Sequence, residues 1–170
     1  MTDEQPAGRY RTLLLDQLAD ERSKKGSIEQ RGIAVITTSG TLVAVTLGFV
    51  ALATRAPGFT LPHTAVILLV SALTVLVAAA VLGLLINVPA RVPLIDAADL
   101  IVVAESSDWS IVDGESAREE YRQQARLLAG LRKVNRIRAR ALFGGLVLEV
   151  TAVLAQAASV VIVLLPLLQR

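Results

Sequence analysis

The chain has 170 residues, 54% of them hydrophobic but only 4% aromatic, and its net charge is +2. This charge does not indicate nucleic-acid binding, so we expect no nucleic acid polymer as a partner. The absence of Cys excludes disulfides, thiolate nucleophiles and Cys-based metal sites. Leu, Val, Ala and Ile are gathered in long blocks, and blocks of about 18 or more such residues are typical of membrane spans.

Residues 1–31 are expected to form a cytoplasmic N-terminal segment that contains an amphipathic helix over residues 9–25. Gly26 suits a helix C-terminus, and Ser27 has the form of a cap that opens a new helix. We therefore expect a break or kink just before the membrane. The mixed charges of this segment do not fit a signal peptide.

The first transmembrane helix is predicted at residues 32–54. Gly40, Ala44 and Gly48 lie four residues apart in it and form a row of small side chains. Such a row lets another helix approach closely. The partner helix belongs either to the same chain or to a second subunit.

The second transmembrane helix is predicted at residues 65–88. Ala79 and Gly83 form part of a second row of small residues, which indicates helix packing. Pro89 ends the helix because proline lacks a backbone N–H and cannot continue it.

Residues 89–140 are expected to form a cytoplasmic helical segment. It would contain a short apolar helix over residues 94–104, a loop with Trp109, and a strong helix over residues 117–140. The third transmembrane helix is predicted at residues 141–166, continuous with the helix before it or joined to it by a mild hinge at Gly144 and Gly145. The fold class is thus an all-α integral membrane protein with three transmembrane helices.

Fifteen of the seventeen Lys and Arg residues lie before the first span or between the second and third spans. The positive-inside rule places the N-terminus in the cytoplasm and the C-terminus outside. The Ala-, Arg- and Val-rich composition is typical of a GC-rich bacterial genome. We therefore expect a multi-pass protein of the bacterial cytoplasmic (inner) membrane, with the lipid bilayer as its first partner.

A basic run without any acid, residues 132–140, stands at the start of the third span. Such a run holds anionic lipid or, as an alternative, a phosphorylated ligand. The candidate contacts to lipid or ligand phosphates are Arg22, Arg132, Lys133 and Arg136.

One stripe of the third span is polar, and it contains Gly145, Glu149, Gln156 and Ser159. An ionisable group in a span is costly and faces a partner or water. Either the stripe lines a pore or an oligomer axis, or Glu149 is protonated and bonds to hydroxyls of the other spans. Both interpretations place the stripe against protein.

No catalytic pattern is present: the sequence has no P-loop, no GxGxxG and no HExxH, and its one His cannot form a metal cluster. We therefore expect no enzyme activity, no metal site and no cofactor. The leading hypotheses are a ligand-gated membrane effector and a non-catalytic structural or assembly subunit. A transporter fits less well because three spans are few and no broken helices recur.

The stretch from Ala19 to Ser23 reads Ala-Asp-Glu-Arg-Ser and precedes two spans, a cytoplasmic helical segment and a further span. In this order of parts the chain resembles the membrane effectors of Pycsar, a bacterial anti-phage system that signals through cyclic pyrimidine nucleotides. An Ala-Asp-x-Lys-Ala-like element precedes the first span in that family; here Arg22 stands for Lys and Ser23 for Ala. The resemblance covers nearly the whole chain. It implies a homo-oligomer that responds to a cyclic nucleotide by impairing the inner membrane.

Overall fold

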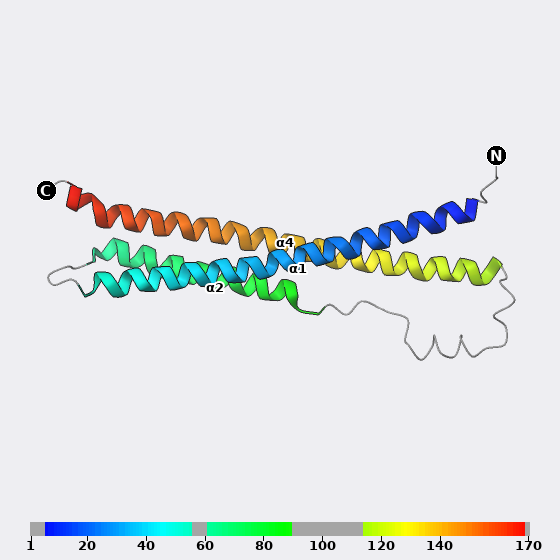
Figure 1. Ribbon diagram of the computed structural model, residues 1–170, viewed down its shortest axis with the longest axis horizontal. Helices are drawn as coiled ribbons and strands as arrows, with labels where there is room; N and C mark the ends of the chain where they lie inside the picture. Colours follow the sequence, from blue (N-terminus) through cyan, green and yellow to red (C-terminus); the bar gives the residue numbers. More distant parts are fainter. Residues whose placement is uncertain (1–5, 56–60, 90–113, 169–170) are drawn as a thin grey trace. The chain divides into compact units, whose positions relative to one another are not determined.

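The computed structural model describes residues 6–55, 61–89 and 114–168, and every regular element in these ranges is an α-helix. The helices are α1 (Pro6–Ala53), α2 (His63–Asn87) and α4 (Gly114–Leu168) (Figure 1). The short helix expected at residues 94–104 and the loop with Trp109 lie outside the described residues.

All three helices are long and apolar enough to cross a membrane, so the chain has the character of a multi-pass membrane protein. A crossing takes about 20 residues at roughly 1.5 Å per residue. With 25 residues, α2 is little longer than one crossing, whereas α1 has 48 residues and α4 has 55. Each long helix therefore extends well beyond one crossing, and the extra residues form a polar stretch in the sequence.

The chain divides into two compact units. The membrane unit comprises Ser27–Val88 and Arg138–Arg170, and it contains the apolar stretches of all three helices. The charged unit comprises Met1–Gly26 and Pro89–Ile137. Both α1 and α4 contribute residues to each unit, whereas α2 belongs to the membrane unit alone.

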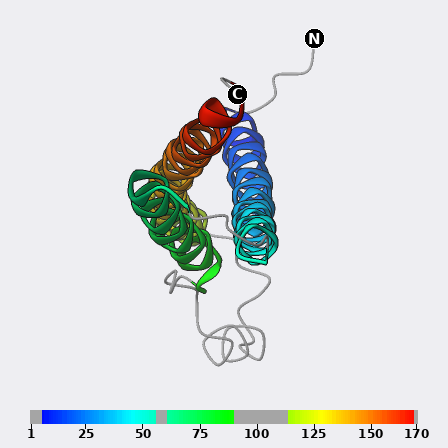
Figure 2. The same cartoon turned by 90° about the vertical axis from the view of Figure 1, so that its left-hand side faces the viewer.

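In the membrane unit each helix contacts the other two (Figure 2). Small and branched aliphatic side chains fill the space between them. One cluster contains Val35, Ala79, Ile86 and Leu142, and a second contains Ala72, Leu76 and Ala152. Large apolar side chains such as Phe143 and Leu154 are exposed on the outside, as expected for surfaces that face lipid.

The closest approach of α1 and α2 occurs at two glycines. A Cβ on Gly83 would lie 2.9 Å from the carbonyl oxygen of Gly32, and a Cβ on Gly32 would lie 3.3 Å from that of Gly83. Only a residue without a side chain permits this backbone contact. Ala79, one turn before Gly83, is fully buried, so the structure places both predicted packing residues of α2 in a helix contact.

The small-residue row of α1 does not pack against any of the described helices. Gly40, Ala44 and Gly48 are all exposed, and a Cβ on either glycine would meet nothing within 4 Å. The contact face of α1 instead carries Val35 and Ser39, which are buried. Of the two alternatives for this row, packing against the same chain is therefore wrong for the described residues, and packing against a second subunit remains a prediction.

The prediction of a break at Gly26 is also wrong, because α1 continues through this residue as one uninterrupted helix. A glycine inside a helix costs only about 0.5–1 kcal/mol relative to alanine. Good helix formers on either side, such as Lys24 and Lys25, are sufficient to carry the helix through it. Helix α4 likewise continues through Gly144 and Gly145 without interruption. This confirms the prediction that the helix before the third span is continuous with that span.

In the charged unit α1 and α4 pack side by side through a small leucine core. Leu18, Leu128 and Leu131 are buried in it. Leu14 and Leu127 cover its edges. The described part of this unit has two helices, so most of its polar side chains lie on outward faces.

Candidate functional site

The polar stripe of α4 lies against the other helices of the membrane unit. Gly145 and Ser159 are buried, and Glu149 and Gln156 are half-buried. Their spacings of four, seven and three residues keep them on one face of a helix. The structure therefore brings the four predicted residues together along one helix–helix contact.

The central contact of the stripe joins Glu149 to α1. The Ser39 hydroxyl donates a hydrogen bond of 2.8 Å to Oε1 of Glu149, and Ser39 is only 1% exposed. A carboxyl group within a span is costly unless it has such a partner. Of the two interpretations of the stripe, this geometry matches the one in which Glu149 bonds to a hydroxyl of another span.

A second polar contact lies two turns further along α4. The Gln156 side-chain amide donates 2.6 Å to the Thr46 hydroxyl, which itself donates 2.7 Å to the Leu42 carbonyl. Ser159, which is fully buried, donates 3.1 Å to the Ala65 carbonyl of α2. We call the set Ser39, Thr46, Glu149, Gln156 and Ser159 the polar seam.

A buried arginine, Arg138, joins all three helices at the end of the membrane unit where its α4 part begins. The Arg138 guanidinium donates to Oε1 of Glu29 at 2.5 Å and to the Val88 carbonyl at 2.6 Å, and Arg138 is 5% exposed. The Val88 carbonyl follows the last turn of α2, where a positive charge is favourable. In the sequence, Arg138 belongs to a basic run, and its buried role is not apparent there. The signal that points to it is an acid, Glu29, and a base, Arg138, each close to the start of a span.

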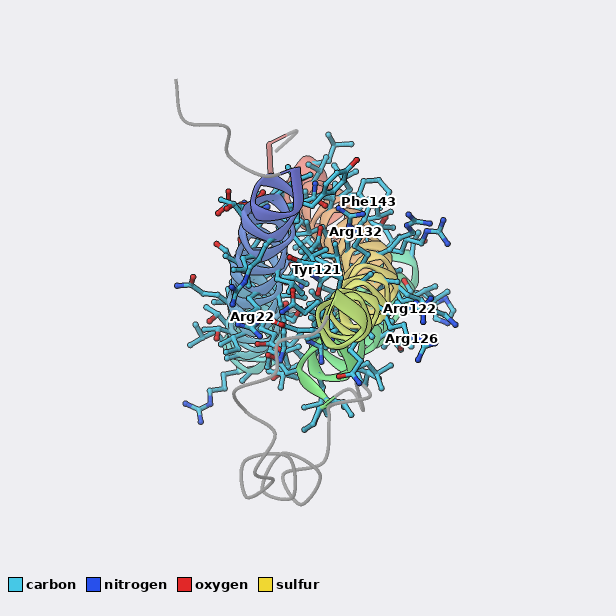
Figure 3. All side chains as sticks on the ribbon, turned by 90° about the vertical axis from the view of Figure 1, so that its right-hand side faces the viewer. Arg22, Tyr121, Arg122, Arg126, Arg132 and Phe143 are labelled. Atoms are coloured by element: carbon cyan, nitrogen blue, oxygen red, sulfur yellow. The ribbon has the colours of Figure 1, made fainter. Side chains whose placement is uncertain are left out.

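The predicted phosphate contacts do not converge on one point. Arg132 donates 2.6 Å to the Gln17 side-chain oxygen and therefore faces α1. Lys133 and Arg136 are exposed on α4, and Arg22 is exposed on α1 (Figure 3). The described side chains thus do not build a single phosphate cradle from these four residues.

Among its described residues, the charged unit buries a polar pair, Glu21 and Asn135, that no sequence pattern indicates. The Asn135 amide nitrogen donates to the Glu21 carbonyl and to Oε2 of the Glu21 carboxylate, both at 2.9 Å. The bond from Asn135 lowers the pKa of Glu21; burial opposes this change, and the Lys24 ammonium and the Arg132 guanidinium add to it. The Asn135 side-chain oxygen is buried without a partner among the described residues.

Within the described ranges, His, Asp and Glu side chains do not gather in groups of three or more that could hold a metal. No known protein family, curated protein sequence or solved structure shows a significant match to the chain. Among the described residues, the polar seam is the feature with the most direct bearing on function, because its hydrogen bonds join α4 to both other helices inside the apolar stretches. It can exchange hydrogen bonds with water or with a second helix inside the membrane.

Proposed function

We propose that the chain is a non-catalytic membrane effector that acts as a homo-oligomer in the bacterial inner membrane. A cytoplasmic signal would separate α1 from α4 in the membrane unit and impair the membrane. The polar seam carries this proposal. The resemblance to Pycsar effectors supplies the class of signal, a cyclic pyrimidine nucleotide, and the biological setting, anti-phage defence.

The seam supports gating because its partners satisfy one another only while α1 and α4 touch. Close van der Waals packing between small side chains can hold two spans together without any polar contact. Parting the helices would leave the Glu149 carboxyl, the Gln156 amide and the Ser39 hydroxyl unpaired in lipid, where each unpaired group costs several kcal/mol. Water is the partner that restores these bonds, so an opened seam would admit water into the membrane.

The exposed small-residue row favours a second candidate, a structural or assembly subunit. Gly40, Ala44 and Gly48 lie on a surface of α1 that no described helix covers. Such rows promote close helix association in lipid. In this case the chain would hold membrane partners together without impairing the bilayer.

Membrane potential in living cells separates the two candidates. We would express the chain with a pyrimidine nucleotide cyclase, with an inactive cyclase as the control, and follow a potential-sensitive dye. The effector proposal expects depolarisation with the active cyclase only, and loss of depolarisation in Glu149→Leu. Thr151→Val is the matched control, because Thr151 is exposed and its hydroxyl donates to the Val147 carbonyl of its own helix. An unchanged potential in the wild type rejects the effector proposal.

A further inference from the structure

We infer that copies of this chain assemble through the charged unit, with α1 of one copy against α4 of the next. The acidic face is defined by Asp16 and Asp20 on α1. The basic face is defined by Arg126, Lys133 and Arg136 on α4. This inference deepens the proposed function, which requires an oligomer, by naming the interface that forms it.

The acidic face lies on the outward side of α1. Asp16 and Asp20 are one turn apart and exposed, and neither has a partner among the described residues. Leu14 and Leu18, which pack against α4, lie on the opposite side of the same helix. The two carboxylates therefore point away from the helix to which α1 is already paired.

The basic face lies on the outward side of α4. Arg126, Lys133 and Arg136 are exposed and follow one another at spacings of seven and three residues, which keeps them on one side of the helix. Their side chains have no partner in the described part of the chain. Leu128 and Leu131, which face α1, lie on the other side. Figure 3 shows one of them, Arg126, pointing away from α1.

The two faces lie at matching heights along the helix pair. The pairs Gln17–Arg132 and Glu21–Asn135 show that α1 and α4 run parallel, with partners 115 and 114 residues apart. The acidic face, residues 16–20, is therefore level with about residues 130–134 of α4, inside the span of the basic face. Copies in one membrane share depth and orientation, so the acids of one copy meet the bases of the next without a shift.

The opposite placement of the two faces determines the kind of assembly. A two-fold axis would bring like charges together, because each face lies on a different helix and on opposite sides of the pair. Head-to-tail contacts satisfy both faces, and such contacts generate a ring when the rotation closes.

A lipid surface is a poorer partner for the basic face. Arg126 and Arg136 are ten residues apart, which corresponds to about 15 Å along the helix. The headgroup layer of one leaflet is only about 5–7 Å thick, so it cannot reach both ends of a helix that runs into the membrane. A neighbouring helix has the required length.

A charge exchange tests the interface. Variant A carries Asp16→Lys and Asp20→Lys, and variant B carries Arg126→Glu and Lys133→Glu. In each variant the net charges of the two outward faces have the same sign, although Arg136 stays in place in variant B. We therefore expect at least a tenfold lower oligomer fraction for either alone in native mass spectrometry from mild detergent. Co-expressed with different tags, A and B should co-purify and recover the oligomer, and so should the chain that carries all four changes. Arg22→Glu is the control and should leave the wild-type oligomer intact.

Several outcomes would overturn the inference. Variants A and B could remain oligomeric, or the combined changes could fail to restore assembly although circular dichroism shows native helix content. Loss of binding to phosphatidylglycerol vesicles by B, without any loss of oligomer, would assign the basic face to lipid. The oligomer is measured without any nucleotide, so a failure here is distinct from a failure of the depolarisation experiment.

Discussion

The membrane unit and the charged unit join α1 to α4 in opposite ways. In the membrane unit, polar groups are enclosed between helices whose outward surfaces are apolar. In the charged unit, a small leucine core lies between the helices, and most charges point outward. The inward polar groups hold spans at a defined rotation, whereas the outward charges remain available to another molecule.

The difference follows from the solvent around each unit. Lipid cannot satisfy a polar group, so a polar side chain in the membrane unit must find a partner in protein. Water satisfies exposed charges, so the charged unit loses little by keeping Asp16, Lys133 and Arg136 outside. Substitutions of inward polar groups should therefore cost more than substitutions of outward ones.

The largest effect is expected at Arg138. Replacing Arg138 by Ala removes the hydrogen bonds to the Glu29 carboxylate and to the Val88 carbonyl, and with the first of them the Arg138–Glu29 ion pair. We expect a loss of about 2–3 kcal/mol in the free energy of unfolding, since bonds to charged groups contribute about 1.5–3 kcal/mol each. Thermal unfolding in detergent measures it. The control Arg140→Ala, at an exposed position, should stay within about 0.5 kcal/mol; equal losses would contradict the buried role of Arg138.

An intermediate effect is expected at the glycine contact of α1 and α2. The added methyl group of Gly83→Ala would lie 2.9 Å from the backbone oxygen of Gly32, so the helices must move apart. Overpacking of this kind costs about 1–3 kcal/mol. The matched change Gly48→Ala meets nothing within 4 Å and should be neutral or stabilising. Thermal unfolding of the two variants side by side tests the assignment, and a destabilised Gly48→Ala would point to a contact of the small-residue row.

The smallest effect is expected when the pH is lowered and the Glu21 carboxylate of the charged unit becomes protonated. Because the pKa of Glu21 is lowered in the folded chain, its stabilisation is present above the ordinary pKa of about 4.5 and is lost as pH falls through the folded pKa. A nitroxide at Leu14→Cys should therefore become more mobile below about pH 4.5 by electron paramagnetic resonance. In Glu21→Gln this transition should disappear. A transition that persists in this variant would show that another group is responsible.

The sequence was sufficient to predict what depends on local pattern. The three apolar helices follow from hydropathy, and the continuity of α4 follows from the absence of proline between residues 114 and 165. Both signals act along one helix. The stripe of Glu149, Gln156 and Ser159 was also found in this way, because spacing alone shows which residues share a face.

The contacts between distant segments could not be predicted in the same way. The pairs Glu29–Arg138 and Glu21–Asn135 depend on the register and rotation of two helices, which no local pattern encodes. The same limit explains the error at Gly40 and Gly48: a row of small residues shows that a face can pack, but not that it faces the same chain.

Water access to the seam tests the central claim most directly. The chain contains no Cys, so Gln156→Cys provides a single thiol within the seam. In membrane vesicles, we expect a membrane-impermeant thiol reagent to label this position only after cyclic CMP and cyclic UMP are added. Leu154→Cys, on the exposed apolar face, should stay unlabelled throughout. Labelling of Gln156→Cys before the nucleotides are added, or protection while the membrane depolarises, would contradict a gated seam.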